Sequence, residues 1–98
     1  MPAYVIGQLD IYDPVAYQEY LDGFMPSFVR HKGELLASSK QETEVFEGTW
    51  STPRTVVLRF PSKQHAKAWY ADPEYVELRK IRQRTARTNL VVVDGVVA

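Results

Sequence analysis

The sequence of 98 residues contains no cysteine. Disulfide bonds, thiolate nucleophiles and cysteine-ligated metal sites are therefore excluded. The sequence also lacks a long apolar run, and its first residues do not form a basic segment followed by an apolar one. Neither a membrane-spanning helix nor a signal peptide is expected, so a cytoplasmic location is the default expectation.

Neither sign of charge predominates, because 12 Lys and Arg residues balance 12 Asp and Glu residues. A neutral chain lacks the overall attraction that draws proteins to nucleic acids or anionic membranes, and we expect neither partner. No nucleic-acid recognition motif, glycine-rich phosphate loop or serine-elbow motif is present. We therefore interpret the basic run of the last third as a solvated helical face: Arg79, Lys80, Arg82, Arg84 and Arg87.

The first predicted helix covers residues 14–31. Asp13 followed by Pro14 is typical of a helix start, with the aspartate as N-cap and the proline where its missing N–H is not needed. Pro26 is expected to kink or briefly break this helix, because proline removes a backbone hydrogen bond. Gly33 fits the left-handed position that follows a helix end.

A second helical region is capped by Ser62 and is divided at Asp72-Pro73, after which it continues to about residue 84. Runs of β-branched and aromatic residues predict four strands. They cover residues 3–11, 34–47, 54–60 and 90–93, and the polar stretch 38–42 interrupts the second.

The predicted order is strand, helix, strand, strand, helix, strand within one domain, residues 1–98. This order is typical of the α+β, ferredoxin-like βαββαβ fold, with a four-stranded antiparallel sheet and two helices on one face. The strands are apolar on both sides: Val57 alternates with Val56 and Leu58, and Tyr4 and Ile6 alternate with Val5. Because the helices cover one face only, we expect a second copy of the chain to cover the other as a homodimer.

Motifs that carry a family resemblance follow one another along nearly the whole chain. They are Pro2-Ala3-Tyr4-Val5, Asp13-Pro14 with Tyr17 and Tyr20, Glu47-Gly48 with Trp50, Val57-Leu58, Phe60-Pro61-Ser62, Ala66 to Tyr70, Pro73-Glu74-Tyr75, Arg82 and Val92-Val93-Asp94-Gly95.

Through these motifs the chain resembles the domain of unknown function family numbered 1330, which comprises small bacterial proteins with a dimeric α+β barrel fold. Two positions depart from the family pattern. Lys32 stands where the first of two glycines is usual, and Asp72 stands where serine is frequent. The resemblance implies fold and dimer and leaves the activity open. The wider α+β barrel group includes cofactor-independent oxygenases, isomerases and decarboxylating enzymes.

Arg82 is the sharpest candidate for a functional residue. It shares a helical face with Tyr75 and Leu78, so its guanidinium is expected to point at the sheet. A buried arginine needs a carboxylate partner or an anionic ligand, and it could clamp a substrate carboxylate. The alternatives are a structural ion pair with Glu47 or Asp10, or a head group that extends to water.

His31 and Glu47 are the candidate proton-transfer groups. His31 lies at the end of the first helix, where it could act as acid or base or simply cap free carbonyls. Glu47 precedes Gly48 and Trp50 at a predicted strand end, which could be the mouth of a cavity. The alternatives are a surface glutamate and a tryptophan at the dimer interface.

Aromatic residues could shape a ligand pocket between helices and sheet, or could only pack the core: Tyr17, Tyr20, Trp50, Trp69 and Tyr75. Our first hypothesis is a homodimer that binds, and could transform, a small, partly apolar, carboxylate-bearing molecule without a metal or tightly bound cofactor. Arg82 would hold the anion and His31 or Glu47 would move a proton. The alternatives are a binding module without turnover and a purely structural dimer.

Overall fold

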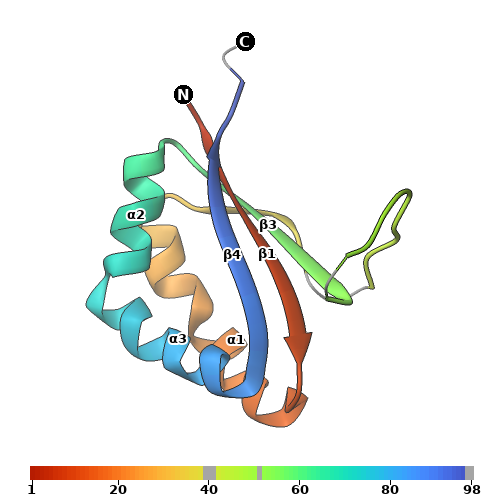
Figure 1. Ribbon diagram of the computed structural model, residues 1–98. Coiled ribbons are helices and arrows are strands. Elements are labelled where there is room, and N and C mark those ends of the chain that lie inside the picture. Colours follow the sequence, from red (N-terminus) through yellow and green to blue (C-terminus); the bar gives the residue numbers. More distant parts are fainter. Residues whose placement is uncertain (39–41, 51, 97–98) are drawn as a thin grey trace.

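The computed structural model describes residues 1–38, 42–50 and 52–96. Four antiparallel strands form one sheet in the order β2-β3-β1-β4. They are β1 (Ala3–Ile11), β2 (Glu34–Ala37), β3 (Arg54–Phe60) and β4 (Ala86–Asp94). The helices α1 (Pro14–Arg30), α2 (Lys63–Ala71) and α3 (Pro73–Thr85) all lie on one side of this sheet (Figure 1). The α+β, ferredoxin-like fold is confirmed.

Capping residues set the helix starts as the sequence predicts. The Asp13 side chain accepts a hydrogen bond from the Ala16 amide at 3.1 Å, and the Ser62 hydroxyl accepts one from the His65 amide at 3.2 Å. Asp72 separates α2 from α3 and caps α3 through the Glu74 amide at 2.9 Å. Within the described ranges, no helix is long and apolar enough to cross a membrane.

Two expectations about α1 are wrong. Of the kink or brief break expected at Pro26, the break does not occur, because the helix continues through Pro26 to Arg30. The left-handed residue after its end is Lys32, with φ of 63°, and not Gly33. Gly33 serves a different need: a Cβ at this position would overlap the ring of Phe28, which is fully buried. The glycine therefore lets the chain pass against the core, while the lysine takes the unfavourable backbone conformation.

The strand ends also differ from the prediction at two places. β2 ends at Ala37. Among the described residues after it, an isolated bridge joins Glu42 to Arg54 and the Thr43 amide donates to the Pro53 carbonyl, but residues 43–47 do not resume the strand. The described residues 42–50 form an arm beyond the start of β3, near Arg54 (Figure 1). β4 begins at Ala86 rather than at residue 90, because its first residues pair with the end of β1, where Ala86 lies opposite Ile11.

The sheet presents one covered and one open face. Toward the helices, β1 and β3 contribute the buried side chains of Val5, Leu9, Leu58 and Phe60, which join the helix aromatics in the core. The opposite face carries apolar side chains that no helix covers: Tyr4, Ile6, Val57, Val91 and Val93. Val91 and Val93 are 54% and 43% exposed. The strands are therefore apolar on both sides, as the sequence predicts.

Candidate functional site

Five of the eight predicted site residues line one cavity between the helices and the sheet: Tyr17, Tyr20, Trp69, Tyr75 and Arg82. The cavity has a volume of about 150 Å³. Inward residues of the strands form its floor, among them Leu9, Val56, Leu58 and Leu90. Leu21, Leu35 and Ser38 also line it, and because all three are exposed, the cavity opens between α1 and β2.

Helical spacing places Arg82 in this cavity. Tyr75 and Arg82 are two turns apart on α3, so both side chains face the sheet, and Arg82 is only 5% exposed. Its Nε has no hydrogen-bond partner among the described residues. The structural ion pair considered above is not formed, because Asp10 pairs with Arg87 at 3.9 Å and Glu47 is exposed on the arm. A buried charge without a carboxylate partner is costly.

Two tyrosines, Tyr20 and Tyr75, interact with the guanidinium in place of a carboxylate. The hydroxyls of Tyr20 and Tyr75 are hydrogen-bonded to each other at 2.7 Å, and the Arg82 guanidinium carbon lies 5.9 Å from the centre of the Tyr20 ring. Burial raises the pKa of Tyr20 well above its usual value, and it also raises the pKa of Tyr75, although the nearby Arg82 partly opposes the second shift. Both tyrosines are therefore protonated at neutral pH.

The charge of Arg82 consequently stays uncompensated. The pKa of Arg82 is raised: burial acts to lower it, and interactions with Tyr75 and Tyr20 outweigh burial. The two tyrosines could neutralise the charge of Arg82 only if they were ionised. Their raised pKa values keep both of them protonated at neutral pH. One hydroxyl of the tyrosine pair donates to the other, which leaves one O–H free to donate elsewhere. The site thus presents a cation and hydrogen-bond donors within apolar walls.

The other three predicted site residues lie elsewhere. His31 Nε2 is 2.7 Å from Asp72 Oδ2, at the junction of α1 with the α2–α3 turn. Glu47 is exposed on the arm 42–50, and Trp50, which is 41% exposed, donates to the Thr55 hydroxyl at 3.1 Å. None of the three lines the Arg82 cavity. The structure therefore does not bring the two candidate proton-transfer groups to the candidate anion holder.

Asp72, whose sequence position indicates a helix boundary, is also the centre of an ion-pair cluster. Its Oδ2 accepts hydrogen bonds from Arg30 at 2.7 Å and from His31 at 2.7 Å. These bonds hold the pKa of Asp72 well below its usual value, with Arg30 as the largest cause. Arg30 also bonds Glu74 at 2.8 Å. The cluster ties the end of α1 to the start of α3, the helix that carries Tyr75 and Arg82.

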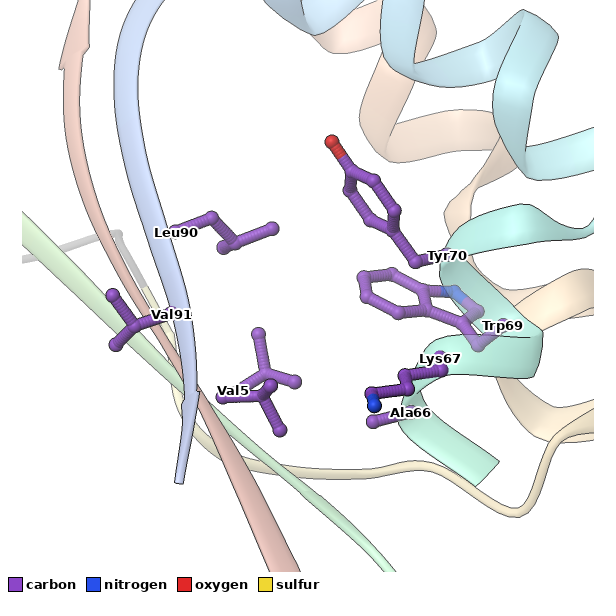
Figure 2. Close-up of a pocket in the computed structure, with 8 residues that line it drawn as sticks. Val5, Ala66, Lys67, Trp69, Tyr70, Leu90 and Val91 are labelled. Carbon is purple, nitrogen blue, oxygen red and sulfur yellow. The ribbon is translucent and has the colours of Figure 1, made fainter. Parts of the chain in front are cut away.

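A second cavity lies between α2 and the edge strand β4. It has a volume of about 350 Å³, and Figure 2 shows Trp69 and Tyr70 of α2 facing Leu90 and Val5 across it. Its walls are apolar, with Lys67 beside them (Figure 2). Trp69 and Leu90 line both cavities. Among the described residues, no group of three or more His, Asp or Glu side chains could hold a metal ion.

The family model described as Domain of unknown function (DUF1330) matches residues 2–96. The chain belongs to the DUF1330 family. No curated protein matches the sequence significantly. Lys32 and Asp72, where the chain departs from the family pattern described above, are now placed at the end of α1 and at the start of α3.

Solved structures share the fold at low sequence identity. A protein of unknown function from Rhodopseudomonas palustris is 19% identical, with a TM-score of 0.77 over 99% of this chain and 84% of that chain. SnoaB, a cofactor-independent oxygenase from Streptomyces nogalater, is 8% identical, with a TM-score of 0.65 over 99% and 95%. A dimeric protein of ferredoxin-like fold and unknown function from Bacteroides fragilis is 15% identical, with a TM-score of 0.63 over 96% of each chain.

Proposed function

We propose that this DUF1330 protein binds a small, partly apolar, carboxylate-bearing molecule in the cavity around Arg82. The observation that carries the proposal is a buried guanidinium with an unpartnered Nε among the described residues and two protonated tyrosines beside it. A carboxylate would supply the missing negative charge and two acceptor oxygens. The apolar walls would cover the remainder of the molecule.

Matched pairs of carboxylic acids and their primary amides test this proposal by thermal unfolding at neutral pH. Each acid should raise the unfolding temperature, and its amide should not, because only the acid carries the charge that Arg82 lacks. A ligand at 100 times its Kd stabilises the folded state by about 2.7 kcal/mol, which is readily measured. The stabilisation should disappear in Arg82→Met. Equal effects of acid and amide, or an undiminished effect in the variant, would contradict the proposal.

A homodimer is the assembly that we propose for the chain. The open sheet face carries an apolar patch formed by Tyr4, Ile6, Val57, Val91 and Val93, and a two-fold dimer buries the same patch on both subunits. The dimeric fold relative from Bacteroides fragilis supports this proposal. Light scattering at micromolar concentration should give twice the chain mass, and Val91→Glu, which places a charge on that face at the edge strand β4, should give the monomer mass. The control Val76→Glu alters a valine on α3 and should leave the dimer intact.

Catalysis is a second candidate function. The Tyr20–Tyr75 hydroxyl pair beside Arg82 supports it, since a protonated hydroxyl next to a bound anion can donate a proton. The fold relative SnoaB works without a cofactor. His31 and Glu47, the proton-transfer groups of the first hypothesis, would need to reach the cavity by a rearrangement. Once a ligand is known, turnover should fall strongly in Tyr75→Phe if catalysis occurs there, while His31→Ala tests the alternative.

A further inference from the structure

The walls of the Arg82 cavity are unusually rich in aromatic rings. Trp69 and Tyr75 are 4.2 Å apart between ring centres, with planes inclined by 34°. Tyr20 lies 6.2 Å from Tyr75 and 5.7 Å from Phe24, and each of these residues lines the cavity. Rings that already pack at tilted and edge-on angles offer both faces and edges to a further ring. A flat aromatic ligand would therefore gain contacts that an aliphatic ligand of equal size would not.

The dimensions of the cavity limit the ligand to one ring. An apolar cavity of about 150 Å³ accommodates benzene, and this cavity has a volume of about 150 Å³. Larger ring systems would have to extend through the opening beside Leu21, Leu35 and Ser38. Arg82, in contrast, lies at the buried end, since it is 5% exposed. The anionic group therefore belongs inside and the edge of the ring belongs toward the opening.

The donors at the buried end select the anionic group. Arg82 Nε and the spare tyrosyl O–H are donors, and a carboxylate accepts from both without bringing a donor of its own. One guanidinium matches one negative charge, so a monoanion leaves no excess charge in an apolar cavity. We propose that the ligand is a single-ring aromatic carboxylate of the benzoate type, with the carboxylate on Arg82 and the ring packed against Trp69, Tyr20 and Phe24. This inference rests on the proposed function.

Benzoate and cyclohexanecarboxylate are the probes that test the aromatic class, because they share charge and carbon count and differ in planarity. Binding is followed by the fluorescence of Trp69 in a Trp50→Phe background, which removes the emission of the only other tryptophan. Benzoate should bind about 2–10-fold more tightly than cyclohexanecarboxylate, as expected from the value of aromatic pairs. Arg82→Met should weaken benzoate binding about 10–100-fold, because it removes a charge-assisted hydrogen bond.

Two further variants locate the site and guard against misfolding. Tyr75→Phe keeps the ring and the charge and removes one hydroxyl, so it should weaken benzoate binding less than Arg82→Met does. Lys67→Met changes the one charged side chain at the second cavity and should leave benzoate binding unchanged. Isothermal titration of the wild type with the same two acids checks the fluorescence result independently.

The outcomes separate this inference from the proposed function. Equal or tighter binding of cyclohexanecarboxylate, still lost in Arg82→Met, would overturn the aromatic class and leave the proposed carboxylate site standing. If neither acid binds at about 10 mM, a concentration above the weakest specific affinities, both the aromatic class and the proposed carboxylate site are overturned. Binding that survives in Arg82→Met would overturn both as well. Binding that is lost in Lys67→Met and kept in Arg82→Met would place the site in the wrong cavity.

Discussion

Replacing Arg82 by methionine should make the unliganded protein more stable. Met is unbranched and similar in length to the methylene part of Arg, so the contacts of the side chain with the core are largely kept. The substitution removes a buried charge whose Nε lacks a partner among the described residues. Leaving such a group unsatisfied costs about 1–3 kcal/mol. Arg82 and the tyrosine pair would thus be retained at the expense of stability.

The gain is reduced by the contacts that the guanidinium does make. Its position 5.9 Å from the Tyr20 ring centre is worth about 0.5–1 kcal/mol at most. Its remaining N–H groups near the tyrosine hydroxyls contribute on the order of 1 kcal/mol. The middle of these ranges gives a net gain of about 0.3 kcal/mol, which corresponds to an increase in Tm of about 1–2 °C for a domain of this size.

Urea unfolding of the wild type, Arg82→Met and Arg82→Ala measures this balance. Arg82→Ala should be less stable than Arg82→Met by about 2 kcal/mol or more, because both variants remove the charge but only alanine also enlarges the cavity. If Arg82→Met lowers the free energy of unfolding by more than about 1 kcal/mol, which is the value of one buried hydrogen bond, the reasoning is refuted. The protein itself would then compensate the charge of Arg82, and the site would not need an anionic ligand.

Three further substitutions test the local geometry. The lowered pKa of Asp72 means that its ionised form stabilises the fold above the usual carboxyl pKa of about 3.9, and that this contribution is lost as the pH falls below that value. Asp72→Asn should therefore flatten the acid limb of a plot of stability against pH. An unchanged acid limb would contradict this. Lys32→Gly should raise the free energy of unfolding in urea by about 1 kcal/mol, because φ is 63° there, whereas Lys32→Ala should not. Gly33→Ala should lower the urea midpoint, at a cost of about 1–3 kcal/mol, since its Cβ would overlap the ring of Phe28, and a neutral result would show that the ring can move.

The sequence predicts those parts of the site that depend on local periodicity. Arg82 and Tyr75 share a helical face by spacing alone, and Tyr17 and Tyr20 do so on α1, so all four could be placed toward the sheet. Their meeting could not be predicted. The Tyr20–Tyr75 hydrogen bond joins residues 55 positions apart and depends on how α1 packs against α3.

Errors occur where a long-range contact overrides a local preference. Helix-end rules favour Gly33 as the left-handed residue. In the structure, position 33 needs glycine because the ring of Phe28 lies against it, and Lys32 adopts the left-handed conformation. β4 begins at Ala86 because Ile11 lies opposite it, and no local pattern in residues 86–89 indicates this pairing. The place of His31 at a helix end suggests a proton-transfer group or a cap of free carbonyls, but its partner is Asp72, which is 41 positions away in the sequence.

The start of the first strand, β1, lies beside the end of the last strand, β4. The Gly95 amide donates to the Pro2 carbonyl at 2.7 Å, and Ala3 lies opposite Asp94. Joining residues 2 and 95 by a short linker would therefore disturb neither β1 nor β4. New ends could be opened in the exposed arm, at Phe46, which is 95% exposed and far from the core. The fold therefore does not depend on where along the chain the sequence begins. A circular permutant that starts in the arm should keep the sheet and the Arg82 cavity.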